Sequence, residues 1–565
     1  MKKLELWLSV GLFCLGTAAH AQVILAPPNP QVGSPQPATA DPKVPRPHTT
    51  PCIVSLFQNL EFADFTPKPF SYTPPSACHA PWAKVVFTAD FTVTEGRQFD
   101  RTASFYLGHA NIYYGTTAEP SSTVSPSWHV ERDVTDLSAI FKGAQTGEAI
   151  LGNFVGTSGG VVYNGIIYAD AALEFYPASF FAPAPGTPDL VVPMPDAEGG
   201  AATLSTTSSQ LAQPVTLPTN VERVYLDVIT QSQIGDEFWY TCVPNDVANE
   251  LESCGNTAFR EAEISIDSQP AGVAPVYPWI YTGGIDPYLW RPIPGVQTFD
   301  FVPYRVDLTP FAGLLSDGDQ HTVALSVYNA NGYFLATANL LVYTDHASKK
   351  VTGGILSNNL AATPTPVVTE NVNTAPNGDV TATVTVTSTR NYKITGYLNT
   401  SHGKIENSAE QLIEFKNTQK FQITAAAYVQ DIQQSTTTSS ESSSKTGPVI
   451  QDTFKRFEYP LILNYSAITG NTGTTAVTTT IQQSDIASTN EALNIFPIYS
   501  SNLLNEVRST DTLNFDASGN LTGTSNRDSS QRYVSINSLG YCYDRLITSA
   551  SGLLTSVQDE GCPGH

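Results

Sequence analysis

The stretch WAKVVFTADF at residues 82–91 decides the expected fold, because it is a short run of the Trp, Val, Phe and Thr residues that β-strands favour. Similar runs recur between turn signals, as ASFYL at 103–107 and AALEFY at 171–176. A second set follows later in the chain, as VYLDVI at 224–229 and TVALSV at 322–327. Strands of this length and spacing predict an all-β protein with two adjacent jelly-roll or β-sandwich domains and few helices.

Changes in composition divide the 565 residues into segments. After Lys350 the chain becomes rich in Thr, Ser and Asn, and the alternating run VTATVTVT at 380–387 predicts exposed antiparallel strands. Within that part, the Ser/Thr-rich residues 435–445 predict a loop. We therefore expect a signal peptide at 1–21, a Pro-rich linker at 22–48, a first jelly-roll domain at 49–178, a linker at 179–218, a second jelly-roll domain at 219–347 and a C-terminal β-rich domain at 348–565.

The first residues have the pattern of an export signal. Lys2 and Lys3 precede an apolar run at 6–15, and the tripeptide AHA at 19–21 has the small residues of a cleavage site. We expect cleavage after Ala21 and a secreted or periplasmic protein. The apolar run is too short for a stable membrane span and no other segment approaches that length, so we expect no membrane insertion.

The chain is acidic, with 28 Lys and Arg residues against 51 Asp and Glu residues and a formal net charge of -23. It has no cluster of basic residues, so we expect no nucleic-acid partner. The high net charge disfavours self-association, which favours a monomer. A sequence pI of about 4.7 fits a protein that works in acidic surroundings.

The cysteine count suits an oxidising compartment. Of the seven cysteines, Cys14 leaves with the signal peptide and six remain. No pair has the spacing of a zinc site, and we expect neither a metal nor another cofactor. The six cysteines are close together in pairs along the sequence, and this locality alone predicts the disulfides Cys52–Cys78, Cys242–Cys254 and Cys542–Cys562.

The stretch from Gly235 to Pro292 carries a dense set of candidate site residues. The sequence DEFWY at 236–240 places two acids beside three aromatics, FRE follows at 259–261, and a Gly-Gly turn at 283–284 precedes WRP. Aromatic faces stack on sugar rings, while carboxylates and a guanidinium hold hydroxyls and amides. We expect a carbohydrate-handling site. The alternative is that the aromatics belong to the core, the acids are solvated and the arginine lies at a rim.

Asp100 is a further candidate, because Phe99 gives it an apolar wall and Arg101 a charged partner. Such surroundings tune the protonation of a functional carboxylate, although a structural ion pair has the same pattern. By contrast, Asp133 and Asp307 begin the similar segments DVTDL and DLTPF. We interpret these two acids as turn-capping residues of two related domains.

Other familiar catalytic patterns are missing from the sequence. There is no GxSxG elbow, HExxH motif, Walker loop or dinucleotide fingerprint. The thiols are expected in disulfides, and we interpret His109 and His129 as hydrogen-bonded structural residues. Carboxylate chemistry remains, and it suits cleavage of a glycoside or an amide by an activated water.

Several spaced motifs follow one another between about Pro51 and Asp345: WHVERDVT at 128–135, DEFW at 236–239, YTGGI at 281–285, LWRPI at 289–293 and DLTPF at 307–311. In this order they resemble the acidic peptide-N-glycosidase A type of glycoamidase. The resemblance implies a secreted bacterial member that hydrolyses the amide bond between asparagine and the innermost N-acetylglucosamine of N-glycans, so that asparagine becomes aspartate. It also implies N-glycosylated peptides or glycoproteins as partners, a cleft between two jelly-roll domains, and no metal.

A more distant likeness, to the peptide-N-glycosidase F type, implies roles for single residues. Phe99-Asp100-Arg101 before a strand resembles the Asp-Arg pair of that type. Asp100 would then be the catalytic acid/base, and Arg101 would contact the chitobiose or tune Asp100. We expect a rate maximum at acidic pH, because few basic residues are present to lower the pKa of the acids.

The second acid of that type falls on Asn256 in this chain, which is a departure from the pattern. Glu237 and Glu261 are the nearest substitutes, and we prefer Glu237 because strand alternation would place it on one face with Trp239 as a sugar wall. Asn153 is expected to replace an acid as an amide-binding hydrogen-bond donor. The remaining residues expected to bind substrate are Asn256, Arg260, Trp290 and Arg291.

Two other classes of function stay open. A carboxylate glycoside hydrolase would leave a sugar on unmodified asparagine, so its products would differ. A non-catalytic lectin or surface adhesin would suit the Thr/Ser-rich C-terminal part, and its glycan handling would survive Asp100→Asn.

Overall fold

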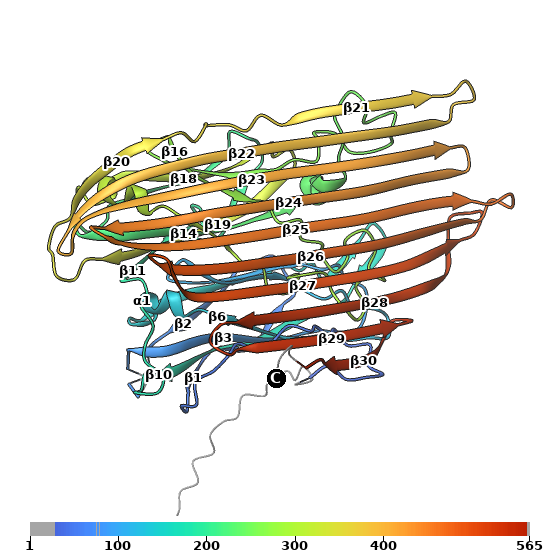
Figure 1. Cartoon of the computed structure of the whole chain (residues 1–565). Helices are drawn as coiled ribbons and strands as arrows, with labels where there is room; N and C mark the ends of the chain where they lie inside the picture. Colours follow the sequence, from blue (N-terminus) through green and yellow to red (C-terminus); the bar gives the residue numbers. More distant parts are fainter. Residues whose placement is uncertain (1–28, 75, 78, 562–565) are drawn as a thin grey trace, which may run out of the picture.

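The computed structural model describes residues 29–561 except 75 and 78, and this part of the chain is almost entirely β (Figure 1). The strands form two sandwiches followed by one large sheet. The expectation of few helices is confirmed, because α1 (Ser138–Phe141) and α2 (Ala312–Leu315) have only four residues each. Within the described residues, no helix is long and apolar enough to cross a membrane. The expected signal peptide at 1–21 lies outside the described residues.

The first sandwich packs two four-stranded antiparallel sheets around an aromatic core. Phe91 stacks on Trp128 with ring centroids 5.0 Å apart, and Phe105 of the facing sheet lies 5.9 Å from Phe91. Smaller elements are η1 (Thr135–Leu137), β8 (Gly156–Ser158) and β9 (Val161–Tyr163). One sheet has the order β1 (Cys52–Phe62), β10 (Ile167–Pro177), β3 (Trp82–Val93), β6 (Ser127–Asp133), and the other has the order β2 (Lys68–Tyr72), β7 (Gln145–Ile150), β4 (Thr102–Leu107), β5 (Ala110–Thr116).

The second sandwich repeats this arrangement. Short 3-10 helices, η2 (Ile234–Asp236), η3 (Trp239–Thr241) and η4 (Thr309–Phe311), lie in its connections. One sheet contains β11 (Leu190–Met194), β19 (Tyr333–Thr344), β14 (Val221–Gln233) and β17 (Tyr304–Asp307), with β12 (Ala202–Leu204) also paired to β19; the other contains β13 (Gln210–Val215), β18 (His321–Tyr328), β15 (Glu261–Ile266) and β16 (Gln269–Pro275).

The two sandwiches share the predicted corner turn. The Asp133 carboxylate accepts the N–H of Thr135 at 3.0 Å, and the Asp307 carboxylate accepts the N–H of Thr309 at 2.8 Å. Each turn is followed by a 3-10 helix and a four-residue α-helix. The interpretation of both acids as turn-capping residues of related domains is therefore confirmed.

The predicted linker at 179–218 is not a linker, because it supplies three strands of the second sandwich. β11 and β12 pair with β19, and β13 pairs with β18. Val191, Leu211 and Val215 from this segment are buried. The prolines between these strands led to the prediction of a linker, although the short apolar runs beside them are buried in the sandwich.

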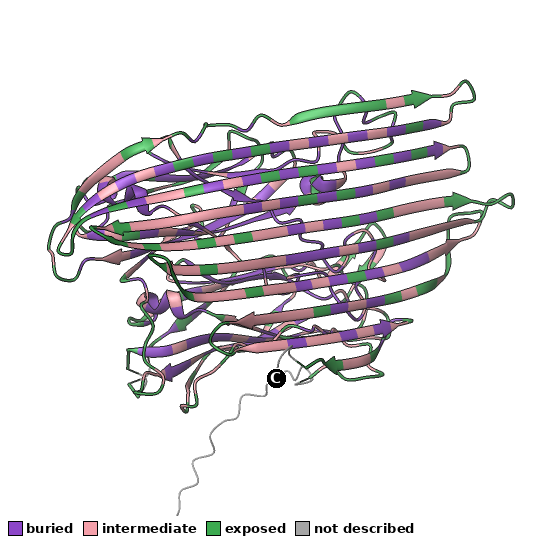
Figure 2. Cartoon of the chain, in the orientation of Figure 1, coloured by how far each residue is buried: buried purple, intermediate pink, exposed green. Residues whose placement is uncertain are grey.

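The C-terminal part is one large antiparallel sheet whose strands run as a layer along the two sandwiches (Figure 1). Buried and exposed residues alternate along its long strands, as the run at 380–387 predicts (Figure 2). Its strands are β20 (Thr352–Asn358), β21 (Val367–Thr374), β22 (Val380–Thr400), β23 (Gly403–Thr424), β24 (Ala427–Thr446), β25 (Val449–Thr469), β26 (Thr475–Leu493), β27 (Phe496–Phe515), β28 (Leu521–Asn537), β29 (Cys542–Ala550) and β30 (Leu553–Asp559).

The loop predicted at 435–445 is wrong, since these residues belong to β24. They pair without interruption with β23 on one side and β25 on the other. Thr436 and Thr438 are buried. Hydroxyl-bearing residues suit a strand when both neighbouring strands complete its backbone hydrogen bonds.

The predicted N-terminal linker is ordered over its described residues 29–48, although it contains no strand. We call residues 29–45 the strap. The N–H of Ala40 donates to the Gln531 side chain at 2.6 Å, and the N–H of Gly33 donates to the Leu554 carbonyl at 2.7 Å. Val44 donates from its N–H to a Glu131 oxygen at 2.9 Å. The strap thus connects the first sandwich to the C-terminal sheet.

The predicted disulfide Cys242–Cys254 is present. It closes a loop whose apolar residues, including Val243 and Leu251, pack on buried Val384 of β22. The other two expected disulfides include Cys78 and Cys562, which lie outside the described residues, and they stay predictions.

Candidate active site

The two sandwiches meet at Asp100, two residues before β4. Its Oδ2 accepts a hydrogen bond of 3.0 Å from the N–H of Gly283, which lies in the connection between β16 and β17 of the second sandwich. Burial raises the pKa of Asp100, although the Gly283 N–H and the Arg101 guanidinium favour the ionised form. Asp100 is therefore a recessed carboxylate at the domain interface.

Glu119 brings a second carboxylate to the same glycine. A Cβ at Gly283 would lie 2.6 Å from Oε2 of Glu119 and 2.8 Å from Oδ1 of Asp100, so both carboxylates lie over the bare Cα of this residue. Burial and the charge of Asp100 raise the pKa of Glu119 to about 7, against the opposing charge of Arg291.

Glu237 completes a set of three acids. It lies between η2 and η3, just after β14. Burial and then the charge of Asp100 raise its pKa to about 7. The charge of Glu237 also contributes to the raised pKa of Tyr281, to which Asp100 contributes as well. We call Asp100, Glu119 and Glu237 the carboxylate group.

Arg101 is held beside this group by buried polar side chains. Its guanidinium donates to Oε1 of Gln98 at 2.5 Å and to Oδ1 of Asn153 at 3.4 Å. Asn153 is fully buried and donates its amide N–H groups to the carbonyls of Phe62 at 2.9 Å and Gly165 at 3.1 Å. Asn153 therefore positions Arg101, and its amide donors are already used inside the protein, which argues against its expected role as a donor to substrate.

Arg291 borders the group from the second sandwich. It donates to the carbonyl of Pro120 at 2.8 Å and forms an ion pair of 3.8 Å with Glu119. Its side chain is 23% exposed, so it can reach a ligand. The neighbouring Trp290 is buried and donates from its indole N–H to the Gly284 carbonyl at 2.8 Å. Trp290 thus shapes the Gly-Gly turn that carries Gly283.

Burial raises the pKa of all three acids. For Asp100 the Gly283 N–H and the Arg101 guanidinium oppose this rise, and the charge of Asp100 adds to burial in raising the pKa of Glu119 and Glu237 to about 7. A protonated acid and an ionised carboxylate at one site can act as general acid and general base. Among the described residues, no group of His, Cys, Asp and Glu side chains could hold a metal ion.

Comparison with known proteins shows which family the chain belongs to. A family model described as "Peptide N-acetyl-beta-D-glucosaminyl asparaginase amidase A" matches residues 38–361, more than half of the chain. The chain belongs to this family. A second model, described as "PNGase_A C-terminal domain", matches residues 383–461, within the large C-terminal sheet.

A curated relative of the amidase A family supports the same assignment. The chain is 30% identical over 392 residues to "Peptide-N4-(N-acetyl-beta-glucosaminyl)asparagine amidase A" of Prunus dulcis, covering 66% of this chain and 67% of the relative. Among solved structures, PNGase F of Flavobacterium meningosepticum is 15% identical, with 52% of this chain and 96% of that chain covered and a TM-score of 0.34. PNGF-II is 13% identical, with 52% and 66% covered and a TM-score of 0.36. At these values the structural likenesses add nothing to the family assignment.

Trp239 of this amidase A family member is not the expected sugar wall. The segment after β14 forms the turns η2 and η3 instead of a strand, so Glu237 and Trp239 do not share a strand face. Trp239 is fully buried and lies between Tyr240 and Phe415 of β23, with ring centroids 5.9 Å and 6.3 Å away. It belongs to the core between the second sandwich and the C-terminal sheet.

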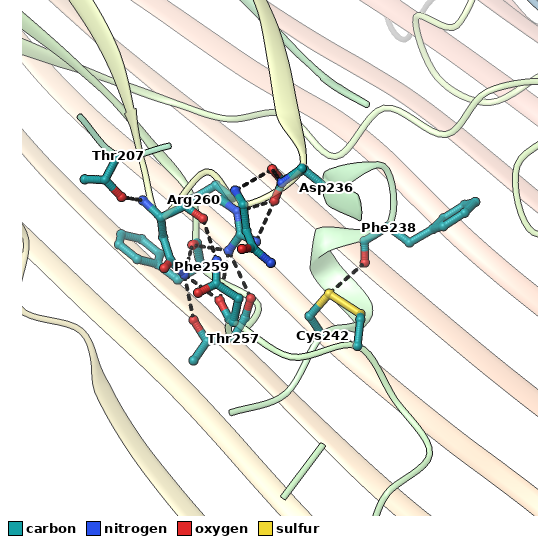
Figure 3. Close-up of polar contacts among 12 residues, drawn as sticks. Thr207, Asp236, Phe238, Cys242, Thr257, Phe259 and Arg260 are labelled. Carbon is teal, nitrogen blue, oxygen red and sulfur yellow. Dashed lines mark hydrogen bonds and ion pairs between the residues drawn. A yellow bond between two sulfur atoms is a disulfide. The ribbon is translucent and has the colours of Figure 1, made fainter. Parts of the chain in front are cut away.

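The turn is fixed by the buried ion pair of Asp236 and Arg260 (Figure 3). One Asp236 oxygen accepts from Arg260 at 2.7 Å, and the other accepts the N–H groups of Asn331 and Gly332. Arg260 donates its remaining N–H groups to carbonyls, including that of Asn256 at 3.2 Å. This network ends β14 at Gln233 and leaves the Arg260 side chain 1% exposed.

Asn256 and Glu261, too, are not brought to the carboxylate group. The Asn256 amide donates to the Asn329 carbonyl at 2.8 Å, within the loop network around Arg260. Glu261 is buried on β15, where it faces Arg390 of β22 at 3.5 Å, and burial raises its pKa to about 8. Both side chains therefore have their polar partners within the protein.

Glu119 was missed by the sequence analysis, although strand pairing carries a signal for it. β4 and β5 form a hairpin in which Thr102 pairs with Thr116, and the N–H of Thr117 donates to the Arg101 carbonyl at 2.9 Å. An acid just after the second strand must then lie beside Asp100, just before the first. Recognising that hairpin and its register would have pointed to Glu119.

Proposed function

We propose that this protein hydrolyses the amide bond between asparagine and the innermost N-acetylglucosamine of N-glycans, releasing the intact glycan and converting asparagine to aspartate. Membership in the amidase A family and the name of the Prunus dulcis relative support this reaction. The observation that carries the proposal is the carboxylate group, in which two acids lie over Gly283 where the sandwiches meet and burial and the charge of Asp100 raise the pKa of a third.

The chemistry needs both a base and an acid, because an amide nitrogen leaves only when it gains a proton. In our scheme ionised Asp100 takes a proton from the water that attacks the amide carbon. Protonated Glu237 gives its proton to the nitrogen as the C–N bond breaks, so a glycosylamine leaves and aspartate remains. Glu119 has the same raised pKa and is the second candidate for the acid.

The scheme predicts an acidic rate maximum. The acid works only while protonated, and its pKa is about 7, so the rate falls as the pH rises through that value. Arg101 and Arg291 border the group and are the residues proposed to bind the sugar end of the substrate.

The test uses one defined N-glycopeptide in heavy-oxygen water at pH 5, followed by mass spectrometry. Loss of the whole glycan with one labelled oxygen in a new aspartate is expected. A product that keeps N-acetylglucosamine on asparagine would establish a glycoside hydrolase instead, and an unchanged glycopeptide would leave a lectin. Comparison of Glu119→Gln with Glu237→Gln, both against Asp100→Asn, then assigns the acid.

Location and assembly are proposed on the sequence alone. We propose export of a bacterial enzyme, with cleavage after Ala21, and a monomer that acts on N-glycosylated peptides or glycoproteins. N-terminal sequencing of protein recovered from the medium or periplasm, and light scattering of the purified chain, check these statements.

A further inference from the structure

A cavity of about 810 Å³ lies apart from the carboxylate group. The strap forms one side, β6 of the first sandwich a second, and strands β25 to β29 of the C-terminal sheet a third. None of its lining residues belongs to the carboxylate group or to the arginines that border it. Its volume falls within the range of about 300–1,000 Å³ that small-molecule sites have.

Asp485 on β26 is among the residues that line this space, and one of its carboxylate oxygens has no hydrogen-bond partner among the described residues. Its Oδ2 accepts a hydrogen bond of 2.6 Å from the Gln297 amide, while its Oδ1 is buried and has no hydrogen-bond partner within the described part of the chain. The residue lines the cavity and is only 7% exposed. A buried oxygen without a partner is destabilising, so a ligand that donates a hydrogen bond near this side chain would be favoured.

Asp41 of the strap offers a second carboxyl on the same side as Asp485, because its partner Asn505 on β27 pairs with Asp485 on β26. Its Oδ1 accepts from the side-chain amides of Gln531 at 2.9 Å and Asn505 at 3.3 Å. Burial raises the pKa of Asp485 to about 6, whereas Asp41 is exposed to solvent. In acidic surroundings Asp485 is therefore protonated and can donate a hydrogen bond as well as accept one.

Tyrosines of the C-terminal sheet supply an aromatic wall. Tyr533 and Tyr543 meet edge to face with ring centroids 5.9 Å apart, and Tyr541 lines the cavity with them. Tyr533 and Tyr543 line the cavity together with Asp41 and Asp485, and the Tyr543 hydroxyl donates to the Ala40 carbonyl of the strap at 2.8 Å. Aromatic faces beside hydrogen-bonding groups are the surface on which sugar rings stack.

The remaining charges in the lining favour a neutral ligand over a cation. Among the lining acids, those other than Asp41 and Asp485 already have cationic partners, and Asp485 is protonated in acidic surroundings, so little counter-charge is left for a cation. Lys43 lies exposed at the edge of the cavity. The ion pairs are Glu131 with Arg46 at 2.7 Å, Asp133 with Lys84 at 2.6 Å, and Asp300 with Arg132.

We propose that this cavity is a second glycan-binding site, which takes a neutral oligosaccharide in the space lined by the strap, β6 and the tyrosines of the C-terminal sheet. Its ligand class is an arm of an N-glycan. The proposal rests on the proposed function for this choice of ligand. The cavity itself is a feature of this chain whatever the reaction.

Binding of a free high-mannose N-glycan, measured by calorimetry at pH 5, tests the site. Ala487 of β26 lines the cavity, and Ala487→Trp would fill it, whereas Ala492→Trp on the same strand lies outside the lining and serves as the control. We expect the wild type and Ala492→Trp to bind one more glycan per chain than Ala487→Trp. Tyr541→Ala, which adds no bulk, should weaken that additional binding at least about tenfold.

Hydrolysis of a short glycopeptide that carries only chitobiose separates this proposal from the proposed function. All three variants should cleave it within about twofold of the wild type, because none of these residues is in the carboxylate group. Equal numbers of glycans on the wild type and Ala487→Trp would overturn the second site, as would unchanged affinity in Tyr541→Ala. A third outcome separates the two proposals. If the wild type cleaved no glycopeptide, and Ala487→Trp still bound one glycan fewer than the wild type, the second site would stand and the proposed reaction would fail.

Discussion

Replacement of Gly283 by alanine is the sharpest test of the carboxylate group, because one methyl group would meet two of its acids. The new Cβ would lie 2.6 Å from Glu119 Oε2 and 2.8 Å from Asp100 Oδ1. Each carboxylate would have to move by about 0.6 to 0.8 Å to reach an ordinary contact of 3.4 Å. Displacements approaching 1 Å cost about 10²-fold in rate. We therefore expect kcat/KM to fall by about two orders of magnitude.

The assay is release of the glycan from a defined glycopeptide at pH 5, with thermal unfolding measured on the same samples. Gly284→Ala is the matched control, since the nearest atoms to a Cβ there are the Tyr281 carbonyl oxygen and N–H nitrogen and an Ile280 methyl, at 3.1–3.3 Å, and no carboxylate. Activity of Gly283→Ala within twofold of the wild type would refute the placement of the two acids. An equal loss in Gly284→Ala would show that the effect comes from the turn and not from the carboxylates.

Three other perturbations test the remaining assignments. Glu237→Gln should lower kcat/KM by about 10²- to 10³-fold and remove the fall in rate above pH 7. In the wild type this fall occurs because Glu237 loses its proton as the pH rises through its pKa of about 7, and a pH–rate profile of each protein measures the two effects. Asp236→Ala should lower the free energy of unfolding by about 3–5 kcal/mol in urea titrations, since it leaves the Arg260 charge buried without its partner, and a loss below 1 kcal/mol would contradict this. Joint replacement of Cys242 and Cys254 by serine should cost about 3 kcal/mol in the same titration, and an unchanged midpoint would count against a stabilising bond.

The sandwiches could be predicted because their signals are local. Runs such as 82–91 carry the β-branched and aromatic residues of a buried strand, and the segments after Asp133 and Asp307 carry the same turn-capping pattern. Strands β11, β12 and β13 were missed because each is short and prolines separate them. Their apolar residues form strands only where β18 and β19 pair with them, and those partners lie more than 100 residues later in the chain.

The site was only partly predictable for a related reason. Asp100 has its signal in its own neighbours, but Glu119 becomes adjacent to it only through the register of a hairpin. Trp239 was misplaced because strand alternation was extended past Gln233, where the buried pair of Asp236 and Arg260 bends the chain. Contacts between residues far apart in sequence decided each of these outcomes.

The strap has a consequence for the order in which the molecule can be completed. It is among the first described segments of the chain, yet its partners on β28 and β30 are among the last, with 491 residues separating Ala40 from Gln531. During synthesis both sandwiches can form before those partners exist, since domains fold as the chain emerges and distant contacts close late. The hydrogen bonds of the strap to β28 and β30 can therefore form only after the C-terminal sheet is complete. A chain truncated before β28 would keep all three acids of the carboxylate group, but its strap would lack the partners on β28 and β30. We therefore expect a protease to cleave such a chain at residues 29–45 while the site is still intact.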